Sequence, residues 1–437
     1  SSRSIILPLR IELAMTFTEL PQRCGRRRPI GLMGAGGWTM HPEATHKAKS
    51  GRTIAIHTRS ASLLSETMMS SASHPADPTS GSLPVSSRQG PEASPWWQPH
   101  VHADRRPRLM ARARLQASIR QWFTDQGFTE VDVAALQVSP GNEAHIGAFA
   151  TQMQDQEGEC RVFLHSSPEF ACKKLLSAGE SQIFSLSHVF RNGERSPLHH
   201  PEFTMLEWYR AGQGLSELQA DCMALLALGA RACGTQVLSF RGRTADPFAP
   251  PELLSVTDAF VRYAGVDLTL SLSEAGTDRD QLAQQAAGIG LRVSGDDSWS
   301  DLFSKILSEF VEPKLGMGRV TFLCDYPVSE AALAQRSLQD ARFAERFELY
   351  ACGVELANAF HELTDAKEQR QRFELEMDER EQVYGERYPL DEDFLAALAL
   401  MPKASGIALG FDRLMMLATG AHKIEDVLWT PVVRTVP

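Results

Sequence analysis

Apolar positions recur at two periods along most of the chain, and each period predicts one kind of element. Between residues 109 and 126, Leu115, Ile119, Trp122 and Phe123 fall on one face of a helix. Further helices are predicted over 170–177, 215–233 and 413–419, and strands over 128–133, 161–165, 182–191, 202–210, 319–325, 346–360 and 406–411.

The order of these elements favours one fold class. Several strands are joined by hairpins and few alternate one-for-one with helices, which favours an antiparallel sheet with helices packed on it, an α+β fold, over a doubly wound parallel sheet. Residues 241–316 are predicted as a helical insertion, because apolar residues recur there at helical spacing. Residues 367–387 carry 12 charged positions of 21, which indicates a solvent-exposed helix whose seam contains Phe373 and Met377.

The first 92 residues differ in pattern from the rest. Hydrophobic periodicity is poor, and 11 of the 35 residues from Ser60 to Ser94 are serine. Such a segment buries too little apolar surface to offset the entropy of ordering, so we expect a disordered extension outside the fold. A targeting peptide, a regulatory tail, and a segment upstream of the natural start or added artificially are three interpretations. Residues 93–437 are then expected to form one domain.

Charge divides the chain at the same place. The net charge is −10, but residues 1–92 carry +5 and residues 93–437 carry −15. An acidic body argues against general electrostatic capture of nucleic acid. The apolar runs fall short of the roughly 18 residues that a membrane span needs. Seven cysteines without a CxxC pair indicate reduced thiols in a cytoplasmic protein.

The hairpin at 182–210 carries the first candidate chemistry. Arg191 ends its first strand before the polar segment 192–195, where a guanidinium can bind a phosphate through two hydrogen bonds. A salt-bridged hairpin is the simpler interpretation of Arg191 alone. It does not explain the polar and aromatic chemistry of the returning strand, where Glu207 and Tyr209 share a face.

Two carboxylates, Glu355 and Glu362, interrupt a hydrophobic strand seven residues apart. An odd offset places them on opposite faces of a regular strand, so they converge only if a bulge or bend lies between them. Convergent carboxylates beside a phosphate would suit Mg²⁺, which prefers oxygen ligands. An ion pair for Glu355 and a helix start at Glu362 explain the spacing equally well.

Residues 406–417 form the third cluster, in which small and large residues alternate along a strand before Arg413 opens a helix. Gly410 permits close approach of a flat ligand such as a purine, and Arg413 could reach a terminal phosphate. Tight packing of strand on helix, with a surface arginine, is the alternative. Neither GxGxxG nor GxxxxGK[ST] occurs, so any ATP would bind without the usual nucleotide loops.

Together the three clusters resemble the catalytic domain of the class II aminoacyl-tRNA synthetases. Residues 190–210 are similar to the second motif of that class and residues 406–417 to the third. Within the class the chain resembles the lysyl branch, in particular the truncated paralogues that ligate (R)-β-lysine to elongation factor P. That likeness rests on Ser167-Pro168-Glu169, on PEFTMLEWYR at 201–210 and on FHELTDA at 360–366, and it spans about residues 95–437.

The resemblance implies an antiparallel sheet flanked by helices and an ATP-dependent, AMP-forming ligase. This enzyme would activate (R)-β-lysine as an adenylate and transfer it to a lysine side chain of elongation factor P. ATP, Mg²⁺ and a homodimer are expected, whereas tRNA and membrane are not. Lysyl-tRNA synthetases place a five-stranded OB-fold before this domain, and residues 1–92 show no such pattern. A synthetase-like enzyme acting on tRNA or making free lysyl-adenylate is the alternative, and an inactive binding paralogue is a second.

The resemblance also assigns residues. Arg191 and Arg413 are the catalytic pair, holding the α- and γ-phosphates of ATP. Other ATP contacts fall on Asn192, Gly193, Glu194, His200, Glu355, Leu356 and Gly410. The amino-acid pocket falls on Ser167, Pro168, Glu169, Tyr209, Glu362 and Ala408. Glu355 and Glu362 would hold Mg²⁺, and Glu362 would also face the substrate amine.

The chain departs from the family pattern at five places, one of which is His200 where Asn is more usual. Gly193 interrupts the usual Arg-Asn-Glu run, so the adenine contact is lost or moves to Glu194. Ala134 replaces a proline of the first motif, which builds the dimer interface. Ala359 replaces a common glycine, so a bend there does not require positive φ. Ala408 also replaces glycine, and its methyl would narrow the α-amino pocket and favour a β-amino substrate by about 1–3 kcal/mol.

Overall fold

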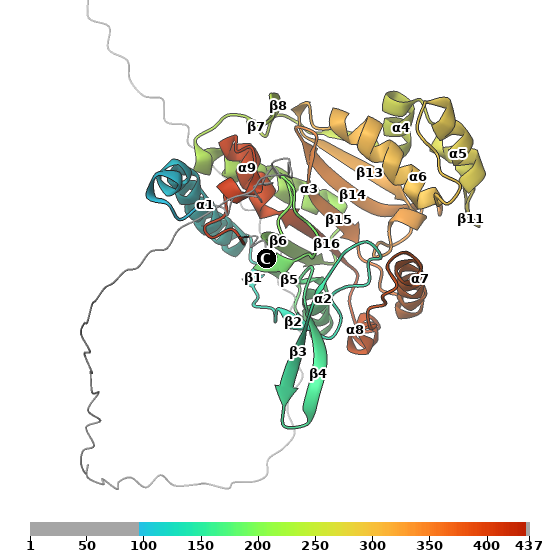
Figure 1. The fold of residues 1–437 in the computed structure, drawn as a ribbon, viewed down its shortest axis with the longest axis horizontal. Coiled ribbons are helices and arrows are strands. Elements are labelled where there is room, and N and C mark those ends of the chain that lie inside the picture. Colours follow the sequence, from blue (N-terminus) through green and yellow to red (C-terminus); the bar gives the residue numbers. More distant parts are fainter. Residues whose placement is uncertain (1–95, 434–437) are drawn as a thin grey trace, which may run out of the picture. The chain divides into compact units, whose positions relative to one another are not determined.

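The computed structural model describes residues 96–433, so the extension predicted over 1–92 lies outside the described residues. The described chain is built around an eight-stranded sheet in the order β1-β5-β6-β16-β15-β14-β13-β9 (Figure 1). Its strands are β1 (Thr129–Glu130), β5 (Gln182–Phe190), β6 (Glu202–Ala211), β16 (Ala404–Gly410), β15 (Val354–His361), β14 (Phe343–Ala351), β13 (Thr321–Pro327) and β9 (Glu252–Ser255).

The interior of this sheet is antiparallel throughout. Every neighbouring pair from β5 to β13 runs antiparallel, and only the edge strands β1 and β9 pair in parallel with their neighbours. Smaller sheets contain β2 (Leu136–Gln137), β3 (Phe149–Asp155) and β4 (Gly158–Leu164); β7 (Leu238–Phe240), β8 (Arg243–Asp246) and β12 (Gly318–Arg319); and β10 (Leu272–Ser273) with β11 (Gly276–Thr277). The predicted α+β class with an antiparallel sheet is therefore confirmed.

Helices cover the sheet on both faces (Figure 1). On one face α1 (Pro99–Asp125), α3 (Leu215–Cys233) and α9 (Phe411–Thr419) form the largest apolar core, around Phe184 and Trp208. On the other face α2 (Glu169–Ser177), α7 (Ala366–Tyr384) and α8 (Glu392–Leu398) pack around Ile183 and Tyr209. The alternation of adjacent residues between the two cores is the two-residue period of a strand that is buried on both faces.

Residues 241–316, predicted as a helical insertion, hold α4 (Val256–Ala264), α5 (Arg279–Gly288) and α6 (Trp299–Ile306) together with β8 to β11. The helices share a separate core with Leu323 and Tyr350 of the main sheet. The six cysteines among residues 96–433 are unpaired thiols. Within the same residues, none of the helices combines the length and apolar character that a membrane crossing requires.

The single strand predicted over 346–360 is two strands. Cys352 and Gly353 adopt φ of 57° and 72°, so β14 turns directly into β15. Two successive residues with positive φ are characteristic of tight hairpin turns, and the turn was missed because only one of the two is glycine. The hairpin matters for the site because it places residues of β14 opposite those of β15.

A β-bulge then changes which residues of β15 face the cleft. Leu349 pairs with Ala357, but the next residue, Tyr350, pairs with Glu355, so Leu356 is the extra residue. Beyond the bulge, the alternation of side chains between the two faces of the sheet is shifted by one residue. This shift places Glu355 and Glu362 on the same face. Ala359 lies in this segment without positive φ, as the sequence predicts.

A buried ion pair joins the two motif segments. Asp412, at the start of α9, pairs with Arg112 of α1 and accepts a hydrogen bond from the backbone N–H of Thr204 on β6 at 2.6 Å. Arg112 also donates to the Thr204 hydroxyl at 2.6 Å. Both charged side chains are almost fully buried, so each neutralises the charge of the other where water cannot reach it.

We therefore expect Asp412→Ala to destabilise the protein by about 3–5 kcal/mol, because it leaves the Arg112 charge buried without its partner. Equilibrium unfolding in urea measures this loss. Glu374→Ala, at an exposed position of α7, is the control and should change the free energy of unfolding by less than about 0.5 kcal/mol. Equal stabilities for the two variants would contradict the proposed role of the ion pair.

Candidate active site

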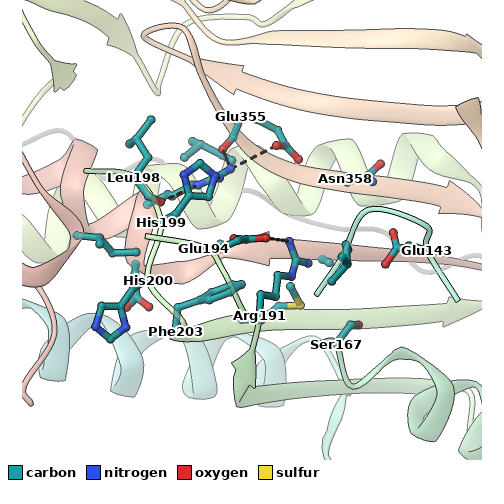
Figure 2. A pocket seen from close by; sticks show the side chains of 18 of the residues that line it. Glu143, Ser167, Arg191, Glu194, Leu198, His199, His200, Phe203, Glu355 and Asn358 are labelled. Atoms are coloured by element: carbon teal, nitrogen blue, oxygen red, sulfur yellow. Dashed lines mark hydrogen bonds and ion pairs between the residues drawn. The ribbon is translucent and has the colours of Figure 1, made fainter. Parts of the chain in front are cut away.

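The predicted site residues converge on one cleft beside strands β6, β16 and β15 (Figure 2). Ten predicted residues line it: Ser167, Glu169, Arg191, Glu194, His200, Glu355, Leu356, Ala408, Gly410 and Arg413. Five other predicted residues are not among those that line it: Pro168, Asn192, Gly193, Tyr209 and Glu362.

The two predicted phosphate-binding arginines occupy different walls of the cleft. Arg413 donates to the backbone oxygen of Glu355 at 2.9 Å and contacts the Glu355 carboxylate at 3.3 Å. Arg191 lies over the ring of Phe203, with 5.4 Å between the guanidinium carbon and the ring centroid. The cleft thus offers two cations that are held by neighbouring groups and remain open to an anionic ligand.

Two histidines of the β5–β6 loop are held by hydrogen bonds. The pKa of His199 is lowered by burial and by Arg413, whose guanidinium lies 2.9 Å from its Nε2. Nδ1 of buried His200 lies 2.5 Å from the oxygen of Glu202, and its Nε2 accepts from the N–H of Val432 at 3.1 Å. His200 therefore fixes the C-terminal segment against the cleft as well as lining it.

The unusual Gly193 has a structural explanation. It adopts φ of 83°, which a glycine tolerates, and so accommodates the extra residue before Glu194. Glu194 points into the cleft, where its Oε1 lies 3.9 Å from Nη1 of Arg191 (Figure 2). Asn192 donates its backbone N–H to Gly147 at 2.8 Å and ties this loop to residues 139–147.

The amino-acid end of the site contains a buried lysine between two carboxylates. Lys173 Nζ lies 2.5 Å from Glu169 Oε1 and 2.6 Å from Glu362 Oε2, and Lys173 and Glu362 are almost fully buried. Although burial opposes it, the two carboxylates raise the pKa of Lys173 above its usual value. Lys173 is charged, but it cannot neutralise every carboxylate in its surroundings.

A third carboxylate lies next to this triad. Glu207 accepts from the Tyr209 hydroxyl at 2.5 Å and from the Ser167 hydroxyl at 2.7 Å, as expected from their shared face. Burial, and then the charge of Glu169, raise the pKa of Glu207 to about 8. Burial likewise raises the pKa of Glu362 to about 7, despite Lys173. Three carboxyl groups face one ammonium, so the cluster has excess negative charge when all three are ionised, and this suits a substrate that brings ammonium groups.

The structure does not bring the two predicted metal ligands together. Glu355 and Glu362 share a face, but the strand between them spans roughly 20 Å at about 3.3 Å per residue. Glu362 instead faces Lys173 at the amino-acid end. Another carboxylate near Glu355 is Glu348 of β14, although the strand register pairs Glu348 with Asn358 and Glu355 with Tyr350. Glu348 forms an ion pair with Arg346 at 2.5 Å and accepts from Tyr326 at 2.5 Å and from Tyr350 at 2.6 Å.

The sequence analysis did not identify several of these residues as parts of the site. Lys173 has a sequence signal, its position four residues after Glu169 on one helix face. Glu348 has a weaker signal, because its approach to Glu355 depends on the turn at Cys352. Glu143, which also lines the cleft, lies in a loop whose position no pattern predicts.

Comparison with known proteins agrees with this geometry. The model of the family described as tRNA synthetases class II (D, K and N) matches residues 98–434, and the chain belongs to that family. An elongation factor P–(R)-β-lysine ligase of Haemophilus ducreyi is 42% identical over 335 residues, covering 76% of this chain and 95% of that protein. The proteins of that name from Haemophilus influenzae strain PittGG and Salmonella typhi are 40% and 38% identical, over 76% of this chain and 96% of each relative.

One glycine shapes the amino-acid end. A Cβ at Gly406 of β16 would overlap both the Glu362 carboxylate and the Tyr209 ring. We expect Gly406→Ala to raise the KM for the amino acid at least about tenfold in pyrophosphate exchange and to leave the KM for ATP within about twofold. Gly288→Ala in α5 is the control, because a Cβ there meets no atom within 4 Å. Equal effects on both KM values would contradict this local role.

Proposed function

We propose that this chain is an ATP-dependent ligase that activates (R)-β-lysine as an aminoacyl-adenylate and transfers it to a lysine side chain of elongation factor P. The relatives that carry this name are matched over 95–96% of their length, which supports the same activity here. The observation that carries the proposal is the pocket itself. Glu169, Glu207 and Glu362 exceed their one partner Lys173 by two charges when ionised, and β-lysine brings two ammonium groups.

In the first step the substrate carboxylate attacks the α-phosphorus of ATP. A carboxylate O–P bond forms, the bond to the β-phosphate oxygen breaks, and pyrophosphate leaves. Arg191 and Arg413 hold the phosphates from two walls of the cleft and stabilise the charge that develops on them. Catalysis is then positioning and electrostatics, without a covalent bond to the protein.

The residues around Glu355 fit Mg²⁺, which takes oxygen ligands from one or two carboxylates and from substrate phosphates. Glu355 lines the cleft and is partly exposed, so this carboxylate would hold the ion, whereas Glu348 is already bound by Arg346 and two tyrosine hydroxyls. Bound there, Mg²⁺ would neutralise charge on the phosphates. Glu362 is occupied by Lys173, so we assign it to the substrate ammonium.

The proposal also covers the oligomeric state, the location and the adenine contact of the enzyme. We expect a homodimer in the cytoplasm, with neither tRNA nor a membrane as partner. Glu194 is proposed to make the adenine contact, because the turn at Gly193 returns its carboxylate to the cleft. Light scattering of the purified chain checks the dimer.

The ligase activity predicts a mass increase of elongation factor P after incubation with the full chain, ATP, Mg²⁺ and (R)-β-lysine. Intact-mass spectrometry measures it, and parallel reactions use α-lysine and (S)-β-lysine. Because Ala408 narrows the pocket, the initial rate with (R)-β-lysine should exceed that with α-lysine by about 10-fold or more. Charging of tRNA without labelling of elongation factor P would instead establish a lysyl-tRNA synthetase.

The raised pKa values predict a pH dependence of substrate binding. A carboxyl group whose pKa is raised to about 7 or 8 is protonated below that pH and must lose the proton to pair with an ammonium. Binding of β-lysine should therefore release protons and become tighter as the pH rises from 6 to 8. Titration calorimetry at pH 6.5, in two buffers of different ionisation enthalpy, measures the release. Glu207→Gln should reduce it, and an identical heat in both buffers would contradict the assignment.

A further inference from the structure

The transfer step of the proposed ligase, on which this inference rests, needs a proton acceptor. A lysine ammonium has an ordinary pKa of about 10.4, so the acceptor side chain arrives protonated and has no lone pair. It must lose a proton before its nitrogen can attack the adenylate. A suitable base lies in the cleft, is ionised near neutral pH and is not already committed to another group.

Most acid–base groups that line the cleft already have partners. Glu169 pairs with Lys173, Glu355 with Arg413, and Asp412 with Arg112. The two histidines are hydrogen-bonded through both ring nitrogens, His199 to Ser196 and Arg413, and His200 to Glu202 and Val432. The remaining carboxylates that line the cleft are Glu194, which lies 3.9 Å from Arg191, and Glu143.

Glu143 differs from all of these groups. Within residues 96–433 its carboxylate receives no hydrogen bond and has no ion-pair partner, and its ionisation is set by burial and by surrounding charges alone. It lines the cleft together with Ser167 and Arg191, and Figure 2 shows it on a loop beside that arginine and across the cleft from His199. A carboxylate beside the arginine assigned to the α-phosphate lies beside the bond that the transfer step breaks.

The loop that carries Glu143 is fixed at several points. The backbone N–H of Ala144 donates to Glu376 of α7 at 2.9 Å, and Arg380 donates to the oxygen of Ala144 at 2.7 Å. Further along, Gly147 accepts from the N–H of Asn192, the residue after Arg191, at 2.8 Å. The backbone that follows Glu143 is therefore held in register with the phosphate-binding hairpin, as a positioned base requires.

The surroundings of Glu143 favour a proton acceptor at neutral pH. Burial raises the pKa of its carboxyl group to about 7. Four charged groups face it: Arg191 of the hairpin and Arg346 of β14 lower this pKa, whereas Glu169 of α2 and Glu376 of α7 raise it. An acid with a pKa near the working pH is both substantially ionised and basic enough to take a proton.

We propose that Glu143 is the general base of the transfer step. The Glu143 carboxylate takes one proton from the acceptor ammonium and becomes a carboxylic acid. The freed nitrogen lone pair forms a C–N bond with the adenylate carbonyl carbon, the C–O bond of the mixed anhydride breaks, and AMP leaves with that electron pair. The second N–H proton leaves on the phosphate of AMP, and Glu143 returns its proton to water.

The test compares the full chain with Glu143→Gln, which keeps the shape of the side chain and removes the base. Transfer of (R)-β-lysine from preformed adenylate to elongation factor P should fall at least about 100-fold in single turnover, the usual contribution of a general base. In the variant, the increase of the transfer rate as the pH rises through about 7 should disappear. Pyrophosphate exchange should keep its KM for (R)-β-lysine, and capture of the adenylate by hydroxylamine, which is uncharged at neutral pH, should keep its rate.

Two further variants test the position and not only the charge. Glu143→Asp should recover part of the transfer rate, because it retains a carboxylate on the same loop. Glu379→Gln is the matched control: Glu379 of α7 pairs with His145 of the same loop, outside the cleft, and its loss should leave transfer unchanged.

Other outcomes would overturn the assignment. Transfer by Glu143→Gln at the wild-type rate excludes a base at this position. A raised KM for (R)-β-lysine in pyrophosphate exchange, with slower hydroxylamine capture, makes Glu143 a substrate-binding group instead. If the unaltered chain labels no elongation factor P, the proposed function fails, and that result is distinct from either outcome for the variant.

Discussion

A lysine ammonium buried between two carboxylates is the constraint on which the amino-acid end of this structure depends. Neither Lys173 nor Glu362 could be buried alone, because an isolated charge in a dry interior costs several kcal/mol. The pair sits behind the cleft, between α2 and the end of β15, and holds these elements in one arrangement. Glu169 completes the triad and turns towards the cleft.

The same triad explains why the pocket selects charge. A cluster with equal numbers of carboxylates and cations would have no net charge to attract a cationic substrate. This cluster, with Glu207 beside it, has more carboxyl groups than cations. The free protein accommodates the excess by holding protons on carboxyl groups that would otherwise be ionised. A substrate with ammonium groups replaces those protons. Substrate recognition therefore exchanges protons for ammonium groups at carboxylates whose charge is compensated both before and after binding.

The sequence predicted most of the scaffold and about half of the residues that line the cleft. Arg191 and Arg413 were identifiable because each ends or follows a strand with a distinctive local composition. Glu348 was not, because its approach to Glu355 depends on a turn and a bulge that only the paired strands define. Glu143 was missed for a related reason. Its position is set by contacts from α7, more than 230 residues later in the chain, and no local pattern records such contacts.

The bulge at Leu356 limits which insertions and deletions strand β15 can accept. Residues 355 to 362 combine a nucleotide-side carboxylate, a buried amino-acid-side carboxylate and a shift in strand register. Deletion of one residue there would leave every catalytic group in the chain. It would nevertheless turn one of the two carboxylates away from the cleft and into the apolar core beneath α3. The segment therefore tolerates exchange of side chains far better than any change in their number, so its length is as much a part of the active site as its charges.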